Sequence, residues 1–87
     1  MASYEVRINH SAEEELLKLD KSIVPVVWQK IKALAEQPKP RQCRKLRRTE
    51  KSYRLRVRDY RIIYTIHDKQ KLVTIVAIRH RREVYRG

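Results

Sequence analysis

Glycine, cysteine and phenylalanine are almost missing from this chain of 87 residues. Gly87 is the only glycine, which excludes a phosphate-cradling glycine loop and a dinucleotide-binding fingerprint. Cys43 is the only cysteine, so no internal disulfide can form, and no apolar stretch of a signal peptide follows Met1. We therefore expect a cytoplasmic protein without a membrane span, and neither a nucleotide-cofactor enzyme nor a secreted disulfide protein.

Metal-ligating side chains are also sparse. His10, His67 and His80 lie far apart in the sequence, and neither CxxC nor HExxH spacing occurs. The second half of the chain contains few carboxylates, namely Glu50, Asp59, Asp68 and Glu83. The sequence thus predicts no metal site and no cofactor, and it gives poor support to a metal-dependent nuclease.

Negative charge is scarce, whereas positive charge is abundant. The chain has 22 Lys and Arg against 10 Asp and Glu, a net charge of +12, and residues 1–20 are net acidic. Between Lys39 and Arg61 there are eleven basic side chains against two acidic ones. This density favours a polyanionic partner through counterion release, so a nucleic acid is the expected ligand.

The segment Tyr53–Tyr64 (YRLRVRDYRIIY) alternates apolar and cationic residues and turns at Asp59 and Tyr60. Alternation with a period of two is typical of half-buried strands. The predicted cationic face consists of Arg54, Arg56 and Arg58. A basic run can be no more than a solvated surface, but cations that alternate with strand-forming apolar residues favour a folded anion-binding face.

Two helices are expected after a short strand at Tyr4–Ile8. A capping box of Ser11 and Glu14 begins the first helix, whose acidic first turn suits the helix dipole. The second helix runs from about residue 22 to 36. Trp28 lies on its apolar side, which favours a core position over a base-stacking role.

The second half of the chain continues with a basic loop, the hairpin and a nearly continuous apolar run at Leu72–Ile78, which predicts an interior strand. The order is strand, two helices and about three further strands. This order predicts one α+β domain over residues 1–87, in which an antiparallel sheet carries both helices on one face.

Arginines, tyrosines and a histidine are sufficient for one reaction that needs no metal. RNA cleavage by its own 2′-hydroxyl requires a base, cations around the crowded phosphate and an acid for the departing 5′-oxygen. Arginine suits the cationic role because its fork is always charged. Surrounding arginines would favour the phenolate of Tyr85 and make it suitable as a base or a stacking residue.

The hairpin motif YRLRVRDYRIIY, followed by VAIRHRREVY, resembles the core of the RelE toxins, within the RelE/ParE superfamily of type II toxin–antitoxin systems. The resemblance covers nearly the whole chain. It implies a RelE-like fold and a metal-independent endoribonuclease that enters the A site of the 30S subunit, contacts rRNA and cuts the mRNA there. It also implies a neutralising antitoxin and hence a toxin–antitoxin hetero-oligomer.

The same resemblance assigns roles to individual residues. Arg61 and Arg81 match arginines that stabilise the transition-state phosphate, and Tyr85 matches a tyrosine that stacks on or deprotonates the nucleotide. Arg54 or Arg56 matches a base or electrostatic helper, although arginine is a poor base because its pKa lies above about 12. The candidate catalytic set is Arg54, Arg56, Arg61, His80, Arg81 and Tyr85. The candidate contacts with RNA or the ribosome are Lys45, Arg47, Arg48, Lys51 and Arg58.

Two departures and two alternatives accompany this assignment. Many RelE toxins have glycine where this chain has Arg58 and Arg79, so these positions must adopt their conformation without glycine. ParE-type toxins share the fold but poison DNA gyrase by protein contact, without a need for the arginine and tyrosine set. A noncatalytic RNA-binding module would use the same arginines to hold the backbone, and Tyr53, Tyr60 or Tyr85 to stack on bases.

Overall fold

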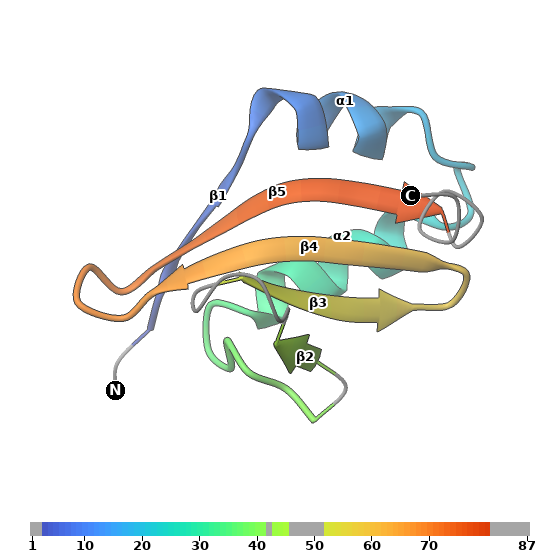
Figure 1. Cartoon of the computed structure of the whole chain (residues 1–87). Coiled ribbons are helices and arrows are strands. Elements are labelled where there is room, and N and C mark those ends of the chain that lie inside the picture. Colours follow the sequence, from blue (N-terminus) through green and yellow to red (C-terminus); the bar gives the residue numbers. More distant parts are fainter. Residues whose placement is uncertain (1–2, 42, 46–51, 81–87) are drawn as a thin grey trace.

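The protein forms one five-stranded sheet with two helices, as the computed structural model shows for residues 3–41, 43–45 and 52–80 (Figure 1). The elements are β1 (Glu5–Ile8), α1 (His10–Leu17), α2 (Val24–Ala33), β2 (Cys43–Lys45), β3 (Ser52–Val57), β4 (Tyr60–His67) and β5 (Leu72–His80). The strand order is β1-β5-β4-β3-β2. The α+β class is therefore confirmed.

Two features of the sheet differ from the sequence prediction. β1 pairs with β5 in parallel, while the other three strand pairs are antiparallel, so the sheet is mixed. The predicted basic loop contains the short strand β2, in which Cys43 lies opposite Leu55 of β3. Three residues are too few for an alternating pattern to identify a strand, and β2 depends on its pairing with β3.

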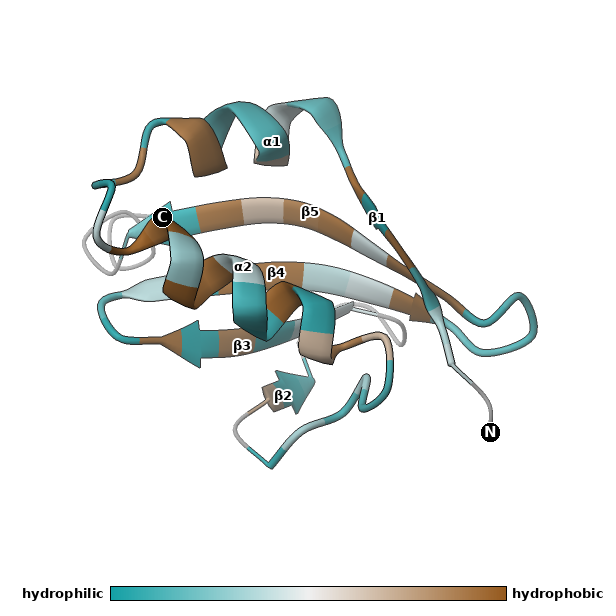
Figure 2. Cartoon of the chain, turned by 180° about the vertical axis from the view of Figure 1, so that it is seen from behind, coloured by the Kyte–Doolittle hydropathy of each residue, from teal (hydrophilic) through white to brown (hydrophobic). Residues whose placement is uncertain are grey.

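The core lies between α2 and the sheet. α2 crosses one face of the strands, as seen from behind in Figure 2, and its Pro25 lies in the first turn, as predicted. The buried apolar side chains are Ala12, Leu16, Ile23, Val27, Ile31, Leu34, Leu55, Val57, Ile62, Tyr64, Ile66, Val73, Ile75, Ala77 and Ile78. Every second residue of β3, β4 and most of β5 contributes, which is the pattern of a sheet covered on one face.

The predicted core position of Trp28 is wrong, because its side chain is 42% exposed. Val27, Ile31 and Leu34 form the buried stripe of α2. Successive helical residues are rotated by roughly 100°, so Trp28 lies at the side of that stripe. Trp28 is therefore a partly exposed surface residue of α2.

α1 runs along the edge of β5 beyond the end of β1 (Figure 1). The predicted capping box is wrong: the helix begins at His10, one residue before Ser11, with Asn9 at the N-cap and no side-chain cap hydrogen bond. Glu15 of α1 pairs with Arg79, and its carboxylate accepts the Ile78 N–H at 3.1 Å. Glu15 therefore satisfies a backbone donor at the part of β5 that β1 does not reach. This contact differs from the expected role at the helix dipole, because the acidic residue in the first turn is Glu13.

Both helices are short. Over the described part of the chain, none has the length and apolar character needed to span a membrane.

Candidate functional site

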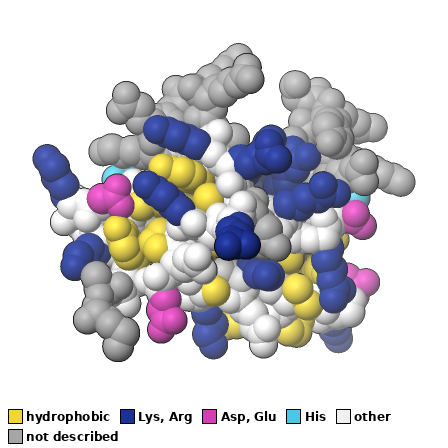
Figure 3. Space-filling model, turned by 90° about the horizontal axis from the view of Figure 1, so that it is seen from below, with side chains coloured by type: hydrophobic (Ala, Val, Ile, Leu, Met, Phe, Trp, Pro, Cys, Tyr) yellow, Lys and Arg dark blue, Asp and Glu magenta, His cyan; other side chains and the backbone are white. Residues whose placement is uncertain are grey.

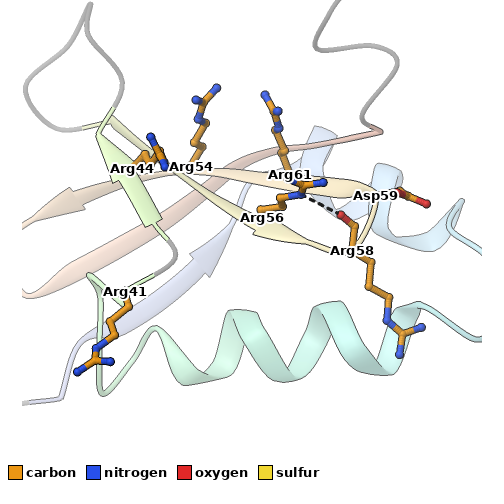
Figure 4. Close-up of a pocket in the computed structure, with 7 residues that line it drawn as sticks. All are labelled: Arg41, Arg44, Arg54, Arg56, Arg58, Asp59 and Arg61. Atoms are coloured by element: carbon orange, nitrogen blue, oxygen red, sulfur yellow. Dashed lines mark hydrogen bonds between the residues drawn. The ribbon is translucent and has the colours of Figure 1, made fainter.

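An open hollow of about 730 Å³ lies beside β2, β3 and the β3–β4 turn (Figure 4). Six arginines and one aspartate line it among the described residues: Arg41, Arg44, Arg54, Arg56, Arg58, Asp59 and Arg61. Its size lies within the range of small-ligand sites, but its lining is cationic and not apolar. The hollow therefore suits an extended anionic ligand.

Strand register explains why four of these arginines share one face. Arg56 of β3 lies directly opposite Arg61 of β4, and Arg44 of β2 lies opposite Arg54 of β3. Directly opposite residues bring their Cβ atoms to roughly 5 Å of each other on the same side of the sheet. Like charges directly opposite each other are unfavourable by themselves, so these arginine pairs suit a site for an anion.

The opposite face of β3 belongs to the core. Leu55 and Val57 are buried, whereas Arg54 is half-buried and Arg56 is exposed. The predicted division of the strand into an apolar and a cationic face is thus confirmed for these residues. Fold and site depend on the same alternation, because the side chains that bury β3 fix the direction of the arginines between them.

Arg58 does not belong to this face, contrary to the prediction. It lies with Asp59 in the turn, and β4 already begins at Tyr60. Its backbone has φ of 55°, a left-handed conformation that ordinarily favours glycine. The Arg58 carbonyl accepts a hydrogen bond from Arg56 Nε at 3.4 Å, and its side chain points away from Arg54 and Arg61 (Figure 4). At this turn an arginine therefore adopts the left-handed conformation without glycine.

The segment that carries Arg41 is anchored by an aromatic cluster. The buried Tyr64 donates a hydrogen bond from its hydroxyl to the Pro38 carbonyl at 2.8 Å, and its ring stacks on Tyr53 at 5.9 Å. Lys39 Nζ lies 5.6 Å from the centre of the Tyr53 ring. Burial raises the pKa of the Tyr64 hydroxyl, which keeps it protonated as a donor. The connection between α2 and β2 is thereby tied to the sheet.

His80 lies apart from the arginine hollow. It faces Tyr60 across the β4–β5 pair, and the two rings meet edge to face at 5.1 Å. Tyr60 packs against the core and lies next to Arg61, so the register places His80 on the face opposite to Arg61. The structure therefore does not bring His80 together with the described candidates Arg54, Arg56 and Arg61.

The remaining predicted site residues divide into two groups. Lys45 lies on β2 opposite Tyr53, on the other face from Arg44, and it does not line the hollow. The residues outside the described part of the chain are Arg47, Arg48, Lys51, Arg81 and Tyr85. Within the described ranges, no cluster of three or more His, Cys, Asp or Glu side chains could hold a metal ion.

Two lining residues, Arg41 and Arg44, were not among the sequence candidates. Arg44 joins the site only because β2 pairs with β3, and Arg41 follows from the anchored connection before β2. The signal in the sequence was limited to the high density of basic residues. Figure 3 shows that cationic side chains also dominate this side of the molecule, with few acidic ones among them.

A second hollow of about 320 Å³ lies between the end of α2 and β3. Its described lining is Lys30, Ala33, Leu34, Gln37, Pro40, Arg41 and Leu55. The buried Leu34 and Leu55 give it an apolar base, and Lys30 and Arg41 add positive charge. Arg41 belongs to both hollows, so they adjoin.

Comparison with known proteins places the chain among toxins. The family model described as "ParE toxin of type II toxin-antitoxin system, parDE" matches residues 6–85. A putative RelE-like toxin protein of Escherichia coli is 31% identical over 86 residues, which cover 94% of this chain and 90% of that protein.

Solved structures of RelE toxins have the same fold. The archaeal RelE–RelB complex from Pyrococcus horikoshii OT3 is 30% identical, with a TM-score of 0.82 over 91% of this chain and 96% of that one. The RelBE2 complex of Mycobacterium tuberculosis is 31% identical, with a TM-score of 0.80 over 91% and 99%. The isolated E. coli RelE toxin is 25% identical, with a TM-score of 0.79 over 97% and 93%. The chain therefore belongs to the RelE/ParE superfamily of type II toxins.

Proposed function

We propose that this protein is the RelE-type toxin of a toxin–antitoxin pair, a ribosome-dependent and metal-independent endoribonuclease that cuts mRNA in the A site. The observation that carries the proposal is the arginine hollow, in which Arg54, Arg56 and Arg61 project from two paired strands. The same three positions match the basic residues of the RelE motif. A toxin that acted through protein contact alone would not require them together.

The proposed reaction needs cations more than it needs a metal. Attack of the 2′-hydroxyl on the adjacent phosphorus gives a crowded phosphorane with additional negative charge, and the 5′-oxygen then leaves. Arg56 and Arg61 lie directly opposite each other on β3 and β4, and in this proposal their guanidinium groups hold the phosphate oxygens. Loss of one such donor typically slows the chemical step by a factor of about 10²–10³.

Proton transfer falls to residues other than the arginines. Asp59 is the only carboxylate among the described residues that line the hollow, and in Figure 4 it lies at the turn, away from Arg44 and Arg54. Arginine keeps its proton at any pH near neutrality. By motif position Tyr85, which lies outside the described residues, is the candidate for base or stacking duty.

Primer extension on mRNA from translating ribosomes tests the proposal. We expect the purified protein to give breaks in A-site codons only when ribosomes are present, and Arg61→Ala and Tyr85→Ala to lose them. Arg7→Ala is the matched control, because Arg7 is an exposed arginine of β1, at the sheet edge opposite to β2. Intact mRNA with the wild-type protein would refute the endoribonuclease proposal.

A second candidate function, inhibition of DNA gyrase, is favoured by the description of the family model, which names ParE toxins. The measurement is supercoiling by purified gyrase in the presence of this protein. Inhibition of supercoiling together with intact mRNA on ribosomes would select this alternative. Uninhibited gyrase together with ribosome-dependent breaks would exclude it.

The proposed partner is an acidic antitoxin. The similar structures from P. horikoshii and M. tuberculosis are a RelE–RelB complex and the toxin–antitoxin complex RelBE2, respectively. In this chain, the second hollow offers an apolar base with Lys30 and Arg41 beside it, which suits an apolar side chain flanked by carboxylates. We expect Lys30→Glu to weaken binding of the antitoxin encoded beside this protein, whereas Lys69→Glu, in the β4–β5 turn, leaves it unchanged. Equal affinity of both variants, measured by titration, would exclude this docking site.

A further inference from the structure

The arginine hollow contains more positive charge than one phosphate group can use. A phosphate has few oxygens, and Arg56 with Arg61 already supplies two forks from opposite strands. The hollow nevertheless extends for about 730 Å³ and includes Arg44 and Arg54. A second pair of forks therefore lies beside the first.

The β3 members of the two pairs are Arg54 and Arg56. Arg54 and Arg56 point to the same side of β3 and are two residues apart, which corresponds to roughly 7 Å along a strand. One nucleotide unit contains as many backbone bonds between successive phosphorus atoms as two residues contain between alternate Cα atoms. The spacing of successive phosphates of one RNA strand is therefore similar to the spacing of Arg54 and Arg56, and the long side chains of Arg44 and Arg61 can reach the same two phosphates from β2 and β4.

We infer that Arg44 and Arg54 form a second phosphate site, which binds the phosphodiester adjacent to the one held by Arg56 and Arg61. This inference rests on the proposed function for the identity of the strand, but the site itself follows from register and charge. Arg44 is exposed on a strand of three residues, and Figure 4 shows it beside Arg54, with Arg54 and Arg61 reaching to the same side of the strands.

The inference assigns a different role to Arg54 from the one that the motif suggests. A fork that pairs with Arg44 on the next phosphate acts in binding and in alignment of the strand, and it does not abstract the 2′-hydroxyl proton. Arg44 is likewise a binding residue that does not touch the reacting atoms. The chain then requires a substrate with at least two consecutive charged linkages.

Binding of short RNA analogues tests the second site without ribosomes or cleavage. The probes are three 2′-O-methyl trinucleosides of uridine: one has two charged phosphodiesters, and each of the others has one linkage replaced by a neutral methylphosphonate. We expect either replacement to weaken binding to the wild-type protein by about fivefold at low ionic strength, as measured by NMR titration. Chain length and base stacking are the same in all three.

Arg44→Ala is expected to bind the fully charged probe about fivefold more weakly and to become insensitive to one of the two replacements, while it remains sensitive to the other. Arg44→Lys should keep part of the sensitivity, and Arg7→Ala all of it. A wild-type protein that ignores both replacements, or an Arg44→Ala variant that responds to both as the wild type does, would overturn the inference.

The same proteins in the ribosome assay separate the two ideas. If the wild type discriminates among the probes but leaves mRNA intact, the phosphate site stands and the endoribonuclease proposal fails. If mRNA is cut but Arg44→Ala cleaves as fast as the wild type and responds to both replacements, the endoribonuclease proposal stands and the second site fails.

Discussion

The hydroxyl of Tyr64 connects the sheet to the segment that carries Arg41. Tyr64→Phe removes its 2.8 Å hydrogen bond to the Pro38 carbonyl and leaves the buried ring and its stacking on Tyr53 in place. A hydrogen bond of this kind contributes about 1 kcal/mol, and somewhat more is lost when the acceptor stays shielded from water. A domain of this size then loses about 4–8 °C in melting temperature.

Thermal denaturation followed by circular dichroism provides the measurement, and Tyr4→Phe is the matched control. Tyr4 also donates a 2.8 Å hydrogen bond, to Asp68, but this bond is exposed and water can replace it. Tyr4→Phe should therefore melt close to the wild type. Equal losses in both variants, or none in Tyr64→Phe, would show that burial of the Tyr64–Pro38 bond does not anchor the segment.

The pH dependence of stability gives an independent readout of the same group. Burial raises the pKa of folded Tyr64, while the unfolded phenol ionises at its ordinary pKa of 10.0. The unfolded state thus binds fewer protons above pH 10, and the contribution of Tyr64 to stability, complete below that pH, is lost as the pH rises toward the folded pKa. The wild type should lose stability faster than Tyr64→Phe above pH 10, as urea titrations would show. Parallel pH profiles of the two proteins would contradict the raised pKa.

Three further predictions concern the fold, and denaturant unfolding measures each. Arg58→Gly should leave the free energy of unfolding unchanged or raise it by up to about 1 kcal/mol, because φ is 55° there, whereas Arg79→Gly in β5 should lower it; a clear loss at Arg58 would contradict the turn geometry. Glu15→Gln should lower the free energy of unfolding by about 1–2 kcal/mol, because it breaks the pair with Arg79 and weakens the acceptor for the Ile78 N–H. Glu13 is exposed, so Glu13→Gln should change the free energy of unfolding little, and equal effects of the two variants would refute the role of Glu15 at the edge of β5. Val27→Ala should lower the free energy of unfolding by about 2 kcal/mol, and Trp28→Ala by less than half as much. The reverse order would show that Trp28 contributes to the core after all.

The sequence predicted those parts of the fold and site that depend on local pattern. Leu55 and Val57 alternate with Arg54 and Arg56, and the structure keeps that division because one face must be buried. A similar local argument failed at Trp28, since helical spacing identifies an apolar side but not how wide a strip the sheet covers.

Features that depend on pairing between distant segments could not be predicted in the same way. The strand at residues 43–45 exists through its bonds to β3, and the parallel pairing of β1 joins segments from opposite ends of the described chain. Arg44 therefore had no sequence signal as a site residue beyond the high density of basic side chains. The sequence pattern predicted a turn at Asp59 and Tyr60, but the turn consists of Arg58 and Asp59. Arg58 is therefore not part of the cationic face of β3.

The parallel pairing of β1 with β5 has a consequence for the time at which this toxin folds during its own synthesis. β1 and α1 are made first, yet both pack against β5, the last strand described. Contacts of such long sequence separation form slowly, and a ribosome adds about 5–20 residues per second. The β3–β4 hairpin with its arginines can assemble locally, whereas the sheet closes only after β5 has emerged. In a nascent chain the hairpin that carries the arginines can therefore form before the sheet that supports it is complete.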